Sequence, residues 1–190
     1  MQYRMKKITQ FLLTSALTTG SLTALYTDSK AQAGNNLNLG IGLGSTFMAA
    51  GVDAGLPPLS ISYEHAFGEK ISGGGFLGYA GASTKAASIG GTWEWKYHYI
   101  MVGARASYHF NFKVPKLDPY VGLMAGYNIA SVSTEKPSGY AGPDIAGAKA
   151  GGAVIGGYAG ARYMLGSKVG AFAELGYGIA YLTLGVTFKM

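Results

Sequence analysis

The sequence predicts an all-β protein, an eight-stranded antiparallel up-and-down transmembrane β-barrel. First, the chain ends on a segment in which apolar residues at every second position alternate with small or polar ones, as a strand with one apolar face requires. These residues are Leu182, Leu184, Val186, Phe188 and Met190. Second, only 13% of the residues are charged, against about a quarter in an ordinary soluble domain. Third, no run of about 18 apolar residues follows residue 33, which excludes a transmembrane helix and favours alternating strands.

The N-terminus has the features of an export signal. A basic start between Arg4 and Lys7 precedes a moderately apolar stretch, and Ala31-Gln32-Ala33 supplies the small-x-small pattern of a cleavage site. We therefore predict a signal peptide at 1–33, which is removed, and a barrel domain at 34–190. An N-terminal amphipathic helix that stays on the protein is the alternative.

The first four strands are predicted where apolar residues alternate with small or polar ones. The first alternates Leu and Ile with Asn and Gly, and the second alternates Leu, Ile and Tyr with Ser and Glu. The third is rich in glycine and carries Leu77 and Tyr79 on its apolar face. The fourth sets Ile, Val, Ala, Tyr and Phe against Arg, Ser, His and Asn. Their ranges are 36–47, 59–67, 71–82 and 96–112.

The last four strands show the same alternation. The fifth sets Val, Leu, Ala, Tyr and Ile against Tyr, Gly, Met and Asn, and the sixth sets Ile, Ala, Tyr and Leu against Tyr, Gly and Arg. The seventh sets Val, Ala, Leu and Tyr against Phe, Glu and Gly, and the eighth is the terminal segment described above. Each is about long enough to cross a bilayer at a tilt. Their ranges are 119–130, 153–165, 169–177 and 178–190.

The connections between these strands alternate in length. Tight, lysine-containing turns lie at 68–70, 113–117 and 166–168, and longer loops lie at 48–58, 83–95 and 131–150. Short periplasmic turns and longer extracellular loops are the usual asymmetry of an outer-membrane barrel. We therefore predict the outer membrane as the location and the three long loops as the surface for any extracellular ligand.

Four charged residues within the predicted strands share the face opposite the apolar stripe. They are Glu64, Arg105, Arg162 and Glu174. A basic residue facing lipid at the bilayer midplane costs about 2–4 kcal/mol, so these charges belong in the lumen. We predict a nearly neutral lumen network in which Glu174 pairs with Arg162 across the turn at 166–168, with Glu64 and Arg105 joining or flanking the pair.

Aromatic residues cluster where the two membrane interfaces are expected. We predict an aromatic girdle that includes Tyr97, Tyr108, Phe110, Phe112, Tyr163 and Tyr177. General β-propensity is the alternative explanation, because Tyr and Phe are common in any strand.

Few other motifs point to chemistry. The absence of cysteine excludes disulfides, thiolate metal sites and cysteine nucleophiles. The three histidines, His65, His98 and His109, are scattered, so we expect no metal site, no cofactor and no catalytic residue. The net charge of the mature chain is roughly +3, too low to indicate a nucleic-acid partner. The triplet Gly91-Thr92-Trp93 weakly suggests a lipocalin, the main soluble alternative, but it precedes the fourth strand instead of the first.

Several segments together resemble the small outer-membrane β-barrel proteins of Gram-negative bacteria, the broad OmpA/OmpX/opacity-porin group. They are the signal peptide ending in Ala31-Gln32-Ala33, the strand opening Asp118-Pro119-Tyr120-Val121-Gly122, Gly160-Ala161-Arg162-Tyr163, the segment from Phe172 to Gly178, and the ending Leu184-Gly185-Val186-Thr187-Phe188. The resemblance implies insertion by the outer-membrane assembly machinery, which reads a C-terminal strand signal. Here that signal comprises Leu184, Val186, Phe188 and Met190, and it departs from the usual aromatic end because methionine is last.

The predicted function is structural or surface-interacting. We expect a monomer in outer-membrane lipid, not an enzyme, with a largely plugged lumen, because an eight-stranded barrel is just wide enough for side chains to fill. One alternative is a narrow porin-like channel for ions or small solutes. A second is a lipid-modifying enzyme, which needs a serine or acid to converge on His98.

Overall fold

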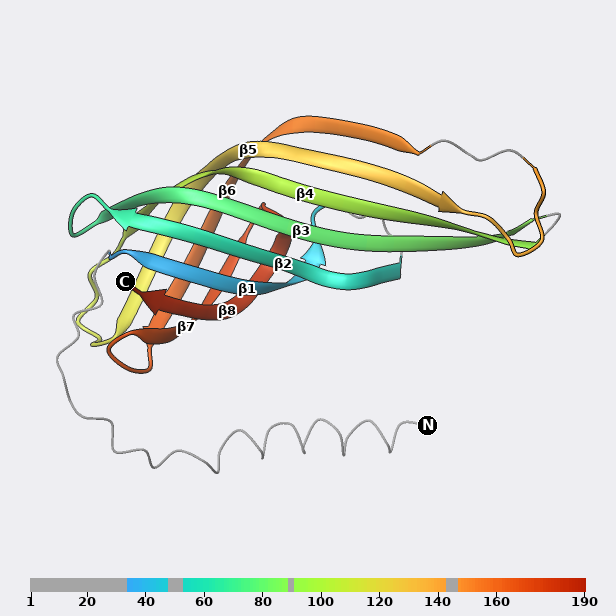
Figure 1. Ribbon diagram of the computed structural model, residues 1–190. Coiled ribbons are helices and arrows are strands. Elements are labelled where there is room, and N and C mark those ends of the chain that lie inside the picture. The colour runs from blue at the N-terminus through green and yellow to red at the C-terminus, as the bar shows by residue number, and fades with distance from the viewer. Residues whose placement is uncertain (1–33, 48–52, 89–90, 143–146) are drawn as a thin grey trace, which may run out of the picture.

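A computed structural model describes residues 34–47, 53–88, 91–142 and 147–190. Within them the chain forms eight β-strands (Figure 1). The strands are β1 Asn36–Ser45, β2 Asp53–Ala66, β3 Ile71–Ser88, β4 Gly91–His109, β5 Leu117–Glu135, β6 Ala148–Met164, β7 Val169–Gly176 and β8 Ala180–Lys189. The predicted signal peptide at 1–33 lies outside the described residues.

Each strand pairs with the next, and β8 pairs with β1 to close the barrel. All eight pairings are antiparallel, and the closing pair runs in register from Asn36 opposite Lys189 to Ser45 opposite Ala180. The predicted fold class is therefore confirmed. In the part of the chain that the structure describes, no helix has the length and apolar character needed to cross a membrane.

Apolar side chains cover the outside of the barrel. In β1, Leu39, Ile41 and Leu43 are exposed, whereas Asn36 and Asn38 are buried. In β8, Leu184 and Val186 are exposed, whereas Thr183 and Thr187, on either side of them, are buried. The predicted alternation is thus observed in both strands that close the barrel.

The strands differ greatly in length, so the wall of the barrel is uneven. β3, β4 and β5 have 18 or 19 residues, whereas β7 has 8 and β8 has 10. In Figure 1 the long strands continue past the barrel as a curved sheet, away from the C-terminus. We call the end with the β2–β3, β4–β5 and β6–β7 turns the turn end, and the opposite end the extended end.

The prediction of long loops is partly wrong. Strand pairing continues through a set of segments that we call the extension: 83–88 of β3, 91–95 of β4, 131–135 of β5 and 148–152 of β6. All of these residues except 151–152 were predicted as loop. β2 also begins at Asp53, within the first predicted loop. The prediction assumed that a strand ends where it no longer needs to cross lipid, but β-branched and aromatic residues such as Thr92, Trp95 and Val132 also favour pairing in water.

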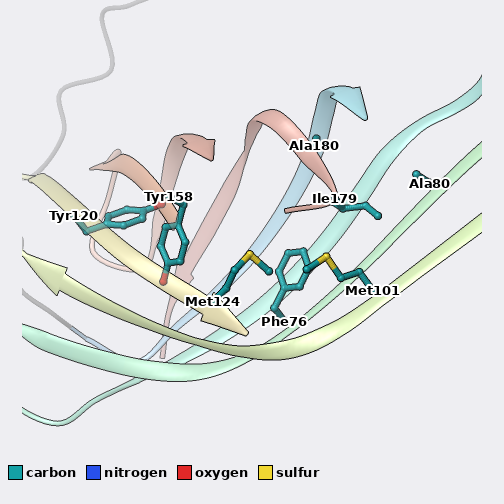
Figure 2. Close-up of a cluster of buried hydrophobic side chains, with 8 residues drawn as sticks. All are labelled: Phe76, Ala80, Met101, Tyr120, Met124, Tyr158, Ile179 and Ala180. Carbon is teal, nitrogen blue, oxygen red and sulfur yellow. The ribbon is translucent and has the colours of Figure 1, made fainter. Parts of the chain in front are cut away.

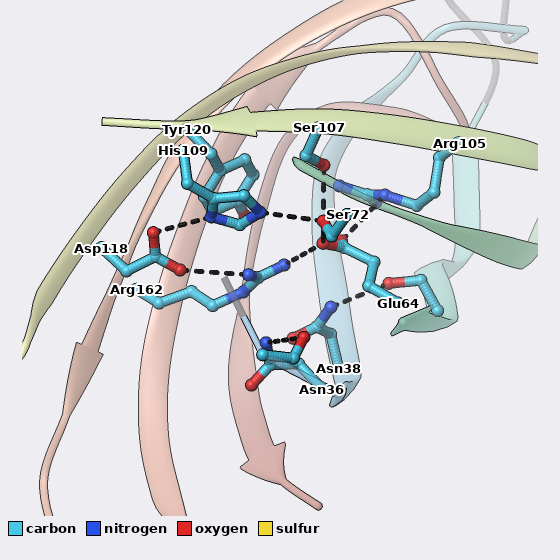
Figure 3. A network of polar contacts seen from close by, with 12 residues as sticks. Asn36, Asn38, Glu64, Ser72, Arg105, Ser107, His109, Asp118, Tyr120 and Arg162 are labelled. Carbon is cyan, nitrogen blue, oxygen red and sulfur yellow. Dashed lines mark hydrogen bonds and ion pairs between the residues drawn. The ribbon is translucent and has the colours of Figure 1, made fainter. Parts of the chain in front are cut away.

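The lumen is filled by two layers of side chains. Towards the extended end lies an apolar cluster (Figure 2), and towards the turn end lies a polar network (Figure 3). The cluster comprises Phe76, Ala80, Met101, Tyr120, Met124, Tyr158, Ile179 and Ala180. Inward glycines make room for the large rings: a Cβ on Gly122 would lie 2.2 Å from the ring of Tyr158. Ile179, in the β7–β8 turn, is 2% exposed and lies against Gly78.

Candidate functional site

The four predicted lumen charges come from four different strands and all lie inside the barrel. Glu64 lies on β2, Arg105 on β4, Arg162 on β6 and Glu174 on β7. Glu64 is completely buried and the two arginines are nearly so, whereas the side chain of Glu174 keeps 15% of its surface exposed. Charges this deeply buried require partners, and each of the four has at least one.

Arg105 bridges two carboxylates. Its Nη2 lies 2.6 Å from Oε2 of Glu174, and its Nη1 lies 3.5 Å from Oε1 of the same residue. On its other side, Nε lies 3.0 Å from Oε1 of Glu64. The guanidinium also stacks over the ring of Tyr158, with Cζ 4.1 Å from the ring centroid. A planar guanidinium suits this position because it binds carboxylates and an aromatic face at the same time.

Arg162 bridges a second pair of carboxylates. Its Nη2 lies 2.7 Å from Oε2 of Glu64, and its Nη1 donates to Oδ2 of Asp118 at 3.2 Å. Its Cζ lies 4.4 Å from the ring centroid of Tyr120. Its contact with Glu64, like that of Arg105, is a close charge contact whose angle falls outside hydrogen-bond geometry. We count both as ion pairs, because charge attraction depends mainly on distance.

The predicted pair of Glu174 with Arg162 is wrong. Glu174 binds Arg105, and Arg162 binds Glu64 and Asp118. The register places Arg162 opposite Phe172, so Glu174 is two residues along its strand. Counting along one hairpin considers only neighbouring strands. In a narrow closed barrel, a long side chain also reaches the opposite wall.

The network also contains side chains that were not predicted from the sequence, among them Asp118, His109 and Ser72. Asp118 accepts from Arg162, His109 Nδ1 lies 2.7 Å from Oδ1 of Asp118, and Ser72 Oγ lies 2.8 Å from Nε2 of His109 (Figure 3). A signal for two of them was present. Asp118 has the same parity on β5 as the inward Tyr120, and His109 has the same parity on β4 as Arg105. The sequence placed His109 on the same face as Arg105 but gave it no partner, and the predicted fifth strand began at Pro119, after Asp118.

Ser72, His109 and Asp118 have the order of contacts of a catalytic serine triad, but the direction of their hydrogen bonds differs. Ser72 has a single hydroxyl hydrogen, and it donates to Oε2 of Glu64 at 2.9 Å. Nε2 of His109 must then be the donor to Ser72, whereas a catalytic histidine accepts from its serine. Ser72 is also completely buried, and His109 is 2% exposed, so a substrate has no access. These residues complete the network and do not form a nucleophile.

Opposite charges in the network are nearly balanced. Three carboxylates, those of Glu64, Asp118 and Glu174, face the two guanidinium groups of Arg105 and Arg162. The ring of His109 adds a polar contact to Asp118. A nearly neutral sum is what a buried, low-dielectric network requires.

Little space remains between the two layers of the lumen. Tyr120 Oη donates to Oε2 of Glu174 at 3.0 Å, and Tyr158 Oη donates to the carbonyl of Ala106 at 3.1 Å, so both rings are held across the lumen. A cavity of about 20 Å³ lies between the layers, lined in part by Arg105 and Glu174. A single water molecule needs roughly 10–15 Å³, so this space holds about one.

The predicted aromatic girdle residues lie mostly on the outer surface. Tyr108, Phe110, Phe112, Tyr163 and Tyr177 are each at least 40% exposed. Tyr97 differs, because it has the same parity on β4 as Met101 and Arg105, on the lumen side. Its assignment to the lipid-facing girdle is therefore wrong, since parity had not been applied to the aromatic residues at this end.

His98, the candidate base of the enzyme alternative, lies on the outward parity of β4. Its Nδ1 lies 2.8 Å from the hydroxyl of Tyr79, a neighbour on β3. Among the described residues, neither a serine nor an acid lies within hydrogen-bond distance of it. The convergence that the enzyme hypothesis required is therefore not observed.

The sheet towards the extended end has two free edges of different character. On β2 the edge contains Pro57 and Pro58, and the pairing with β3 is irregular there. On β6, pairing with β7 begins at Tyr158, so in the described part of the chain the segment 148–156 pairs with β5 alone. Proline has no N–H to donate and blunts an edge, whereas the β6 edge consists of Gly, Ala, Val, Ile and one Lys.

Four charged residues at the extended end form two ion pairs. Lys85 Nζ lies 3.6 Å from Oε2 of Glu94, and Lys96 binds the carboxylate of Glu135. The hydrogen bond that the Lys96 ammonium donates to the carboxylate of Glu135 raises the pKa of Lys96 above its usual value. These pairs lie on the surface and contribute little stability.

No protein-family model matches this sequence, and no curated protein matches it. Similar solved structures include the N-terminal β-barrel domain of Pseudomonas aeruginosa OprF, at 18% identity and a TM-score of 0.47, covering 84% of this chain and 100% of that one. Neisserial surface protein A is 17% identical, with a TM-score of 0.48 and coverage of 82% and 96%. Ail of Yersinia pestis, in complex with the heparin analogue sucrose octasulfate, is 13% identical, with a TM-score of 0.43 and coverage of 82% and 95%. These likenesses concern the fold, which this chain's own strand pairing establishes.

Proposed function

We propose that this protein is an outer-membrane β-barrel with a closed lumen that presents the extension as a binding surface outside the membrane. The observation that carries the proposal is the inverted distribution of side chains. Large apolar residues such as Leu123, Ile155 and Leu175 are more than 60% exposed, whereas Glu64 and Arg162 are buried. Lipid solvates such an outer surface, and a water-soluble barrel has the reverse arrangement.

The orientation follows from the two ends of the barrel. The short, lysine-containing turns face the periplasm, and the extension faces the exterior, as in other outer-membrane barrels. Both Asn36 and Lys189, which pair at the turn end, then lie on the periplasmic side. Insertion by the outer-membrane assembly machinery through Leu184, Val186, Phe188 and Met190, and removal of residues 1–33, complete the proposal.

The two filled layers support a barrel that does not conduct. An ion crossing the lumen must break the ion pairs around Arg105 and also displace Ile179 and Met101 from the apolar layer. We expect no single-channel current from the refolded protein in a planar bilayer, and none from Glu174→Ala, because the apolar layer remains in place. A steady current from the unmodified protein would instead establish the narrow-channel alternative.

The open edge of β6 supports a role in binding extended peptides. The carbonyl of Gly157 accepts a hydrogen bond from the N–H of Tyr177, so it points towards the β7 side. In an antiparallel strand, the N–H and C=O groups of every second residue point to the same side, so the odd-numbered residues before Gly157 also point towards β7. Lys149, Gly151 and Ala153 thus direct their N–H and C=O groups towards the free edge. An added strand is the partner that satisfies such a row of donors and acceptors.

A proline substitution tests this binding mode. Ala153→Pro removes one edge donor without removing a hydrogen bond to β5, whereas Ala153→Ser keeps the donor and is the matched control. We expect peptides selected from a random library against the refolded protein to lose at least tenfold in affinity for Ala153→Pro and to keep their affinity for Ala153→Ser. Equal binding to all three proteins would reject strand addition at this edge.

A further inference from the structure

An apolar groove of about 490 Å³ lies on the outer surface of the barrel, across β3, β4 and β5 near the turn end. Its lining comprises Ile71, Ala106, Ser107, Tyr108, Val121, Gly122 and Leu123. The volume is within the range of small-molecule sites, about 300–1,000 Å³. The groove lies on the lipid-facing side, so its occupant comes from the membrane if the proposed function is correct.

The register explains the shape of the groove. Ile71, Tyr108 and Val121 lie side by side on three adjacent strands and form a raised row nearest the turn end. The next outward row contains Gly73, Ala106 and Leu123, so the floor is low on β3 and β4 and rises at Leu123. A further row of Gly75, Ala104 and Ala125 continues the low floor towards the middle of the barrel. The depression therefore runs from the membrane interface into the hydrocarbon region.

The mouth of the groove lies beside cationic and aromatic side chains. Lys70 directly precedes Ile71 and accepts a hydrogen bond at its carbonyl from the N–H of His109, which places it at the rim of β4. Lys113 lies in the turn that follows β4. Both lysines are exposed. Phe110 packs against Tyr108, with ring centroids 5.2 Å apart, and continues the wall towards these lysines.

We propose that this groove holds an acyl chain of an anionic phospholipid of the inner leaflet, whose phosphate binds Lys70 and Lys113. The apolar floor accepts the chain, and the lysines at its mouth complement the charge of the headgroup. At the extended end, by contrast, Lys85 and Lys96 are already paired with glutamates. The proposal rests on the proposed membrane location.

Lipid retention tests the site directly. The full mature protein is refolded into vesicles of equal phosphatidylglycerol and phosphatidylcholine, gently extracted, and analysed by native mass spectrometry. We expect the ratio of bound phosphatidylglycerol to phosphatidylcholine to exceed the vesicle ratio. Lys70→Gln and Lys113→Gln should each lower the ratio about fivefold, from the electrostatic contribution of one lysine near a headgroup.

The controls separate a site from general attraction. Lys168→Gln, in the β6–β7 turn at the same end, should leave the ratio of bound phosphatidylglycerol to phosphatidylcholine unchanged. If this variant lowered the ratio as much as Lys70→Gln does, the proposal would be overturned. Ala106→Leu fills the floor and should reduce total lipid retention severalfold. Ala171→Leu, on the lipid-facing side of β7, is its matched control and should leave retention unchanged.

Three further outcomes are informative. A retained second copy of the chain in place of lipid would show that the groove is a protein interface and would reject the proposal. Failure of the protein to insert into vesicles would reject the proposed function itself. Insertion with no lipid preference would reject the lipid site alone.

Discussion

The two layers of the lumen fill the same barrel by different means. Towards the turn end, Glu64, Arg105 and Arg162 hold one another through directed ion pairs, and each has only a few acceptable partners. Towards the extended end, Met101 and Ile179 fill space without direction. A side chain of the polar layer therefore depends on particular residues of other strands, whereas one of the apolar layer depends only on volume. The two layers should respond differently to substitution.

The largest effect is expected for Arg162→Ala. This change leaves the carboxylates of Glu64 and Asp118 buried without one of their cations, and breaking a buried pair in this way costs about 3–5 kcal/mol. The free energy of unfolding is measured by urea titration of the protein in vesicles, followed by far-ultraviolet circular dichroism. Tryptophan fluorescence is unsuitable, because Trp93 and Trp95 both lie in the extension.

Lys168→Ala is the control for this substitution. Lys168 lies in the exposed turn after β6, so its removal should change the free energy of unfolding by less than about 0.5 kcal/mol. If Arg162→Ala and Lys168→Ala lowered the free energy of unfolding by similar amounts, the ion pairs of the polar layer would contribute no more stability than a surface charge.

Met101→Ala should have the next largest effect. Met101 is completely buried in the apolar cluster, and replacing it leaves a cavity that costs about 2–4 kcal/mol. Met101→Leu keeps the volume and should cost less than about 1.5 kcal/mol. The same urea titration compares the two variants, and equal losses would contradict a layer that depends on volume alone.

A double-mutant cycle distinguishes the observed pair from the one predicted by hairpin counting. Arg105→Gln combined with Glu174→Gln should give a coupling energy of about 1–3 kcal/mol, because their side chains form a two-point contact. The cycle of Arg162→Gln with Glu174→Gln should give a clearly smaller value. A larger coupling energy for Arg162 with Glu174 than for Arg105 with Glu174 would support the pair predicted from the hairpin.

The smallest of these effects is expected for Ser72→Ala. The substitution removes a donor to Glu64 and an acceptor for His109, at a cost of about 1–2 kcal/mol in the free energy of unfolding. The unmodified protein should also fail to react with a serine-directed fluorophosphonate, since Ser72 is buried. Labelling that disappears in Ser72→Ala would show that the lumen opens and that the enzyme alternative is correct.

Much of the wall of the barrel was predictable from local pattern. Alternation placed Leu39, Ile41 and Leu184 on the outside and Glu64 and Arg105 on the inside, because a strand has only two faces. The same rule, applied to Tyr97 and Asp118, would have corrected one assignment and added one network member. Strand length was less predictable, because pairing into the extension depends on neighbouring strands that are also long.

The amino-acid sequence by itself determined which side of the wall most residues occupy, since successive positions of a strand point to opposite faces. Only the tertiary structure decided which charges meet. Arg162 reaches Glu64 because closure of eight tilted strands sets β6 and β2 across a narrow lumen, at a relative height that no single hairpin specifies. The groove across β3, β4 and β5 arises for the same reason, because the small residues of three strands align only once their register is set.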